Sequence, residues 1–277
     1  MASRPLRAVV AALVLLCTAA TFAFAHDLFL KPAAFFVAPN GTVRLTALNG
    51  TFSTSEASVT ADRLLDLAVV GPDGRARGDT AAWSAKGKAS TWAAHVGAAG
   101  TYVFGASLRP KQITLTGAQF NAYLADDGLP DILAARTGSG ELAKPSTERY
   151  AKHVKALVQV GDARTASFGT VLGYPAELVP LDNPYEAVRG SRVLRVKALV
   201  DGAPMPDQVV LAGGRTASGS RIASQTVRTD AQGVARVALG TRGVWYVKFI
   251  RMVKIPASAR DSVDYESKWA TLTFAVR

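Results

Sequence analysis

Short apolar runs separated by turn residues dominate this sequence and limit the folds open to it. Runs such as "TVRLTAL", "LLDLAVVG" and "TYVFGASL" are rich in branched and aromatic residues. Turn clusters such as "PNG", "GPDG" and "GAAG" lie between these runs. Regularly spaced short strands of this kind are typical of β-sandwiches, so we expect a mainly all-β protein.

One stretch, residues 115–154, interrupts the strand pattern and predicts a short helical insert. Phe120, Tyr123 and Leu124 have the spacing of one helix face. Thr116 is a suitable N-cap for this helix, and a second short helix is expected a few residues further on.

The chain divides into two expected domains after a leader. Residues 26–185 are expected to form a β-sandwich that contains the helical insert. Residues 186–277 have their own pattern of strands and turns, and in the last strand Leu272, Phe274 and Val276 alternate with small or polar residues. This second part is similar to immunoglobulin-like and transthyretin-like modules, which predicts a second β-sandwich.

The first 25 residues have the three parts of a secretory signal peptide. Arg4 and Arg7 form the positive start, an apolar stretch follows, and "AFA" is a small-x-small cleavage site before His26. Cleavage would remove Cys17, the single cysteine, and would leave a chain with no disulfide and no stable membrane span. We therefore expect an exported, periplasmic protein.

The positive charge of the chain does not by itself indicate nucleic-acid binding. The net charge falls from +11 to +9 when Arg4 and Arg7 are removed. No block of five like charges and no basic stripe interleaved with aromatic residues is present. We expect a solvated basic surface and no nucleic-acid partner.

Five blocks, in this order, resemble an uncharacterised bacterial periplasmic family often labelled nickel-uptake-associated, or NikM-like. They are "HDLFLKP", "FNAYLADDGLPDIL", "STERYAKHVKALVQVG", "LGYPAELVPLDNPY" and "YESKWATLTF". The resemblance implies a metal-handling accessory and a partner such as a metal permease or an envelope protein. In this family many members are expected to carry a histidine in the strand that reads "WYVKFIRM" here, where this chain has Arg251.

His26 is the strongest candidate metal ligand. As the first residue of a cleaved chain, it offers both its α-amine and imidazole Nδ1 to one ion, and Asp27 adds a carboxylate oxygen. Nitrogen donors of this kind suit Ni(II) and Cu(II). A useful site needs a further ligand, and the only other histidines are His95 and His153.

Three functional hypotheses remain open on these residues. The first is metal binding at His26, with Asp27, His153 and His95 as further candidates and a nickel or copper ion as the cofactor. The second is a metal-free β-sandwich adaptor for a carbohydrate, an envelope component or a partner protein. The third is an enzyme, a copper oxygenase with an N-terminal histidine brace, which needs a second imidazole opposite His26. No hydrolase motif is present, and we expect no catalytic residues.

Overall fold

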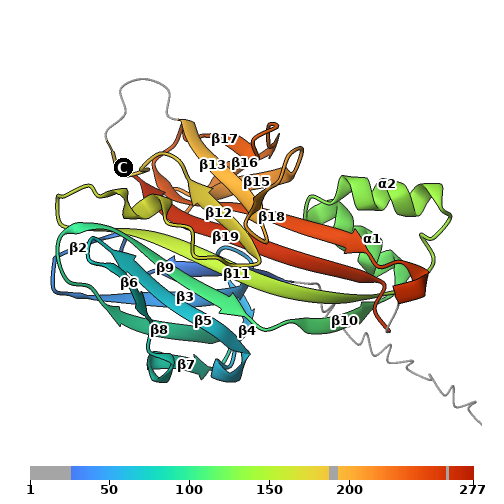
Figure 1. Cartoon of the computed structure of the whole chain (residues 1–277), viewed down its shortest axis with the longest axis horizontal. Helices are drawn as coiled ribbons and strands as arrows, with labels where there is room; N and C mark the ends of the chain where they lie inside the picture. The colour runs from blue at the N-terminus through green and yellow to red at the C-terminus, as the bar shows by residue number, and fades with distance from the viewer. Residues whose placement is uncertain (1–25, 187–192, 260–261) are drawn as a thin grey trace, which may run out of the picture.

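The computed structural model describes residues 26–186, 193–259 and 262–277 (Figure 1). The predicted signal peptide lies outside these ranges. The described residues are mainly strands, as predicted, and they form three sheets and two α-helices. No helix in these ranges is both long and apolar enough to cross a membrane.

A ten-stranded sheet runs through the middle of the molecule. Its strands are β2 (Phe36–Val37), β5 (Leu64–Gly71), β6 (Gly74–Arg77), β9 (Gly100–Leu108), β10 (Lys111–Leu115), β11 (Ser146–Val160), β15 (Val209–Arg215), β16 (Arg221–Arg228), β18 (Gly243–Lys254) and β19 (Tyr265–Val276). Two long neighbouring strands, β11 and β19, pair in parallel from Glu148–Tyr265 to Ala156–Thr273. Because each comes from a different predicted domain, the boundary near residue 186 does not divide the sheets. Sequence alone carries little signal for a parallel pair so far apart in the chain.

Two smaller sheets cover opposite faces of the long sheet. The five-stranded sheet contains β1 (Asp27–Pro32), β3 (Thr42–Gly50), β4 (Ser55–Ala57), β7 (Trp83–Lys86) and β8 (Ala89–His95). The four-stranded sheet contains β12 (Ala176–Pro180), β13 (Val193–Val200), β14 (Ala203–Pro204) and β17 (Val234–Ala238). Short 3₁₀ turns lie at Ala61–Arg63, Thr80–Ala82, Ala166–Gly169 and Ala257–Ala259.

The apolar cores explain why β11 does not alternate between polar and apolar residues. Val158 of β11 belongs to the core under the five-stranded sheet, whereas Leu157 belongs to the core under the four-stranded sheet. Both side chains are fully buried, because successive residues of a strand point to opposite faces. The molecule is therefore a layered sandwich in which the central sheet is covered on both sides.

Helices α1 (Gly117–Asp126) and α2 (Pro130–Gly138) cover the end of the long sheet, as Figure 1 shows. Thr116 caps α1 as predicted, in a reciprocal capping box with Gln119. The apolar face of α1 packs on β18 and β19. The predicted helical insert was too long, however, because residues 146–154 belong to β11. Buried polar residues in this part of β11, such as Glu148 and Lys152, hide the strand pattern.

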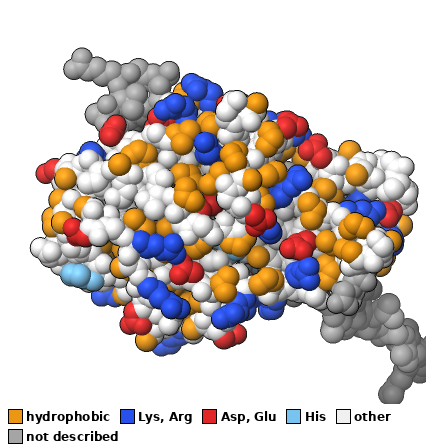
Figure 2. Space-filling model, viewed as in Figure 1, with side chains coloured by type: hydrophobic (Ala, Val, Ile, Leu, Met, Phe, Trp, Pro, Cys, Tyr) orange, Lys and Arg blue, Asp and Glu red, His pale blue; other side chains and the backbone are white. Residues whose placement is uncertain are grey.

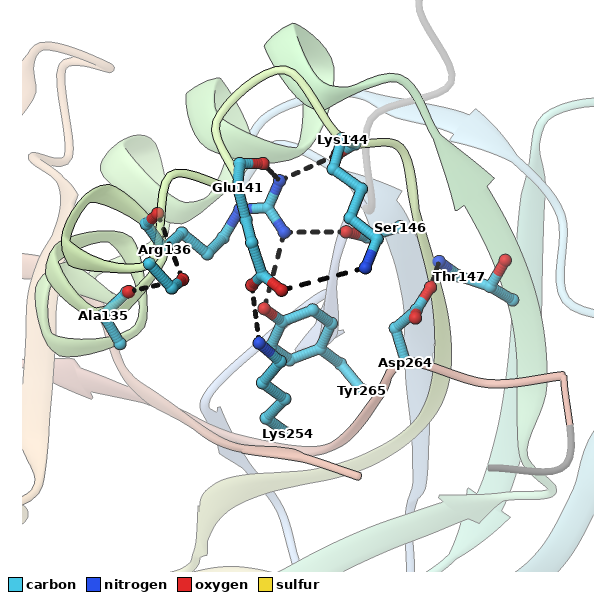
Figure 3. Close-up of polar contacts among 10 residues, drawn as sticks. Ala135, Arg136, Glu141, Lys144, Ser146, Thr147, Lys254, Asp264 and Tyr265 are labelled. Atoms are coloured by element: carbon cyan, nitrogen blue, oxygen red, sulfur yellow. Dashed lines mark hydrogen bonds and ion pairs between the residues drawn. The ribbon is translucent and has the colours of Figure 1, made fainter. Parts of the chain in front are cut away.

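A buried arginine fixes the helical segment to the sheet (Figure 3). Arg136 of α2 is only 2% exposed. Its Nη2 donates to the carbonyl oxygens of Glu141 and Lys144 at 2.7 and 2.8 Å, and Nη1 donates to Ser146 Oγ at 2.8 Å. Its guanidinium also lies 4.9 Å from the ring centre of Phe120 in α1. These contacts hold α1 and α2 in place over the sheet.

The surface mixes charge types. On the face drawn in Figure 2, lysine and arginine side chains lie among acidic and apolar ones, without a continuous basic band. On this face the basic residues are therefore dispersed among other side chains.

We expect Arg136→Met to lower the free energy of unfolding by about 3 kcal/mol, because two part-buried carbonyl groups and the buried Ser146 hydroxyl lose their charged donor. Urea unfolding measures this change. Lys254→Met is the matched control, since Lys254 contacts Glu141 at 2.5 Å in an exposed pair and should contribute less than about 1 kcal/mol. Equal losses in the two variants would contradict the anchoring role of Arg136.

Candidate functional site

A cavity of about 500 Å³ lies where β1, the β3–β4 connection, the end of α1 and the β15–β16 hairpin meet. Tyr246 of β18 also lines this cavity. The segments come from both predicted domains, so only the assembled sheet creates the cavity. A volume of this size is typical of a small-molecule site.

Lys248 joins three distant segments at the base of this region. Its Nζ lies 2.6 Å from Asp27 Oδ2 and 2.7 Å from Asp127 Oδ1, and its side chain is only 7% exposed. Burial disfavours the charge on Lys248, but the two carboxylates outweigh burial and raise the pKa of the lysine. The ion pairs connect β1, the end of α1 and β18, and so fix one wall of the cavity.

The surroundings of Asp127 shift its pKa upward. Burial first, and then the negative charge of Asp27, raise the pKa from 3.8 to about 6 against the opposing effect of Lys248. Asp127 follows Asp126 at the carboxyl end of α1, where the helix dipole also disfavours negative charge. Two acidic residues at this helix end therefore lower the stability of the folded protein, and the ion pair of Asp127 with Lys248 compensates for part of this loss.

His26 lies in the wall of the cavity beside an acidic residue that sequence reasoning did not identify. His26 Nε2 is 3.2 Å from Glu56 Oε2, and the side chains are 23% and 48% exposed. Within the described ranges no hydrogen bond engages Nδ1 of this ring. Asp27 Oδ1, in the same cavity wall, is buried and has no hydrogen-bond partner among those residues.

Lys152 of β11 holds the backbone at the start of β1. Its Nζ donates to the carbonyl oxygen of His26 and lies 3.4 Å from Asn49 Oδ1. Burial lowers the pKa of Lys152 to about 8, although Asp27 acts in the opposite direction. The ammonium also lies 5.1 Å from the ring centre of Trp269. The backbone of His26 is therefore held by the side chain of a buried lysine.

Three aromatic rings form an apolar part of the cavity wall. Phe29 lies 5.1 Å from Phe52 and 5.1 Å from Tyr246 between ring centres, and Phe52 lies 4.9 Å from Tyr246. Gly213 on β15 allows the close approach of Tyr246, because a Cβ there would lie 2.8 Å from the tyrosine oxygen. The cavity thus combines an acidic wall, an imidazole and an apolar surface.

The structure does not bring His153 to His26. His153 is buried, and its Nδ1 lies 2.8 Å from Ser107 Oγ. Burial lowers its pKa to about 4. Adjacent residues of a strand point to opposite faces, so His153 points away from the face on which Lys152 contacts His26. Its proposed role as a partner ligand for His26 therefore does not match the geometry.

His95 is also remote from His26. His95 pairs with Thr42 at one end of β3, whereas Asp27 pairs with Gly50 at the other end. Eight residue steps of an extended strand correspond to roughly 26 Å. His95 is exposed at its strand end, and the arrangement offers His26 no second imidazole for a brace.

Two aromatic residues and one arginine near the cavity-forming strands take no part in the site. Tyr265 and Trp269 share one face of β19, and both are 2% exposed in the core beneath α1. Arg251, which stands where relatives are expected to carry histidine, is exposed. It lies an odd number of residues from Lys248, so it points to the opposite face of β18.

Sequence reasoning missed Glu56, Asp126, Asp127 and the arginines of the β15–β16 hairpin. For Asp126 and Asp127, the sequence "ADDG" at the expected end of a helix was a signal of a special role, because negative charge is unfavourable at the carboxyl end of a helix. Glu56 gave no signal, since it reaches His26 through the irregular pairing of β3 with β4. Among the described residues, no group of three or more His, Cys, Asp or Glu side chains is arranged to hold a metal ion by itself.

The fold and the cavity define a layered β-sandwich protein with a ligand-sized cavity. Residues 23–252 match the family described as "Domain of unknown function (DUF4198)", and the chain belongs to this family. This confirms the expected membership of an uncharacterised family. The family description names no metal and no transporter, so the nickel association stays a prediction.

The other comparisons add little. No curated protein matches the chain. A DUF4785 family protein from Legionella pneumophila is 10% identical, with 79% of this chain and 50% of that chain covered and a TM-score of 0.24. The Escherichia coli adhesin FdeC is 14% identical, with 91% and 65% covered and a TM-score of 0.23. The chain thus spans half the length of the first protein and 65% of the second.

The raised pKa of Asp127 predicts a specific pH dependence of stability. Between about pH 4 and 6 the folded protein binds the proton of the Asp127 carboxyl group more tightly than the unfolded chain does. The stability that the protonated Asp127 contributes is therefore lost as the pH rises through this range. The free energy of unfolding of the wild type, minus that of Asp127→Asn, should fall by as much as about 3 kcal/mol from pH 4 to 7.

Urea unfolding at a series of pH values measures this difference. Asp126→Asn is the matched control, because Asp126 is the exposed neighbour in the same helix end. An equally large decrease for Asp126→Asn, or no decrease for Asp127→Asn, would contradict the assignment.

Proposed function

We propose that this protein is a periplasmic metal-binding accessory protein that serves the uptake or handling of nickel, cobalt or copper. The metal is bound by His26 as the first residue of the processed chain. The observation that carries this proposal is the contact of His26 Nε2 with Glu56 at 3.2 Å. The negative charge of Glu56 so close to Nε2 favours a proton on that nitrogen, which would leave Nδ1 as a donor for a metal.

The chemistry of the proposed site depends on the free amine. The α-amine and Nδ1 of one N-terminal histidine close a chelate ring on a single ion, and nitrogen donors suit Ni(II) and Cu(II). Side chains alone do not form a complete metal site in the described residues, so processing before His26 supplies the missing donor. The buried and unpartnered Oδ1 of Asp27 offers a further acceptor in the same wall.

Reversible binding suits a carrier that passes the ion to a membrane permease. Protons compete for both nitrogen donors, so metal affinity should decrease as the pH falls. The site is also partly exposed, because 23% of the His26 side chain is accessible to solvent. Access from the cavity allows an ion to enter and leave.

The metal-free adaptor stays the alternative function. The aromatic wall formed by Phe29, Phe52 and Tyr246 favours this alternative, because apolar rings suit a carbohydrate or another organic ligand. On this alternative the α-amine and Glu56 would have no role, so the two functions make different predictions for the same variants.

Calorimetric titration of the chain that begins at His26 with Ni(II) and Cu(II) tests the metal proposal. Acetylation of the α-amine or His26→Ala should lower the affinity more than tenfold. Glu56→Gln should weaken binding by about 10-fold to 100-fold, because the carboxylate orients the ligating ring.

His95→Ala is the matched control, since this exposed histidine lies at the other end of β3. Its metal affinity should equal that of the wild type. Equal affinities for the free and the acetylated chain would show that the amine is not a ligand and would favour the adaptor.

A further inference from the structure

The cavity is much larger than a metal ion needs. It measures about 500 Å³, whereas one water molecule takes about 30 Å³ of liquid volume. His26, Asp27 and Glu56 occupy only one wall of it. The remaining walls therefore face space that a bare ion at His26 would leave to solvent.

Two arginines line this remaining space. Arg215 ends β15 and Arg221 begins β16, and they are direct cross-strand partners at the end of one hairpin. Like charges directly opposite each other in an antiparallel pair are destabilising. Neither arginine makes an ion pair with an acid within residues 26–186, 193–259 and 262–277.

The hydrogen bonds of these arginines hold them in place without neutralising them. Arg215 Nε donates to Ser53 Oγ at 2.9 Å and Nη1 donates to the carbonyl oxygen of Gly219 at 3.1 Å. Arg221 Nη2 donates to Ser224 Oγ at 3.0 Å. Each guanidinium therefore keeps further N–H donors for another group.

A third cation, Lys31, lines a neighbouring groove that shares Arg215 with the cavity. Lys31 lies beside Arg215, and its ammonium is 5.0 Å from the ring centre of Phe52. Burial lowers the pKa of Lys31, and the charge of Arg215 lowers it further. Arg215 thus has like charges beside it in Lys31 and Arg221. Asp27, Glu56, Asp126 and Asp127 line the same cavity, but among the described residues none of them forms an ion pair with Arg215 or Arg221.

We infer that the protein takes up its metal as a complex with a small carboxylate-bearing chelator. His26 contacts the metal, Arg215 and Arg221 bind the free carboxylates of the chelator, and the rings of Phe52 and Tyr246 contact its carbon skeleton. Guanidinium groups recognise carboxylates through paired, charge-assisted hydrogen bonds. This inference rests on the proposed metal-binding function and specifies the form in which the metal arrives.

Equilibrium dialysis of the chain that begins at His26 tests this inference with Ni(II) alone and with its complexes of citrate, malate and histidine. Nickel and isotopically labelled chelator are both counted on the protein side. The wild type should retain about one chelator per nickel for at least one complex. The double variant Arg215→Gln/Arg221→Gln should retain that chelator at least about tenfold more weakly, because it loses two charged donors.

The affinity of the same double variant for Ni(II) alone should lie within about twofold of the wild-type affinity. The His26→Ala variant should bind neither Ni(II) alone nor the nickel–chelator complex. Arg77→Ala is the matched control, since Arg77 is an exposed arginine on β6 outside the cavity, and it should change neither. Thermal unfolding verifies that all variants fold.

The outcomes separate the inference from the proposed function. Nickel retained without any of the three chelators, or chelator retained equally by the arginine double variant, would overturn the inference and leave metal binding intact. No nickel retention in any form would overturn both. Arginine-dependent retention of a chelator without nickel would overturn the inference as stated and support the metal-free adaptor.

Discussion

The parallel pairing of β11 with β19 is the constraint on which the rest of the structure depends. The two strands come from opposite halves of the chain and pair over nine positions from Glu148 to Ala156. Parallel strands of this kind require cover on both faces. The five-stranded sheet, the four-stranded sheet and the two helices provide this cover, each with its own apolar core. The segments that line the cavity belong to the long sheet, to the five-stranded sheet with its β3–β4 connection, and to the end of α1.

The packing of these layers also brings charged residues from distant segments together at the cavity. Lys248 on the long sheet meets Asp27 from β1 and Asp127 from the end of α1, so three segments far apart in sequence share one buried contact. Removing one partner from such a group would leave an uncompensated buried charge. Arg215 and Arg221, which also line the cavity, are cross-strand partners, and within the part of the chain that the structure describes neither forms an ion pair with an acid. The cavity is therefore lined both by acids that pair with Lys248 and by arginines without such a pair, and the arginines carry our proposal of an external anion.

Local sequence patterns predicted the local structure well. The N-cap at Thr116 and the apolar face of α1 depend on neighbouring residues, which is why spacing revealed them. The single buried face expected for the last strand was wrong, because β19 lies between β18 and β11 in the long sheet and residues of both its faces are buried. The extent of the helical insert was predicted wrongly, because Glu148 and Lys152 are buried polar residues in β11 and resemble a solvated segment. Their partners, such as Tyr123 and His26, lie in other elements and are invisible to a local pattern.

The sequence by itself determined that the protein is mainly β-structure, because strand propensity and turn chemistry act over a few residues. Only the tertiary structure decided which groups surround His26. It placed Glu56 on Nε2, separated His153 from His26 by the thickness of a sheet, and set His95 at the far end of β3. The register of distant strands fixes such neighbours, and register depends on packing across the whole molecule rather than on residue spacing.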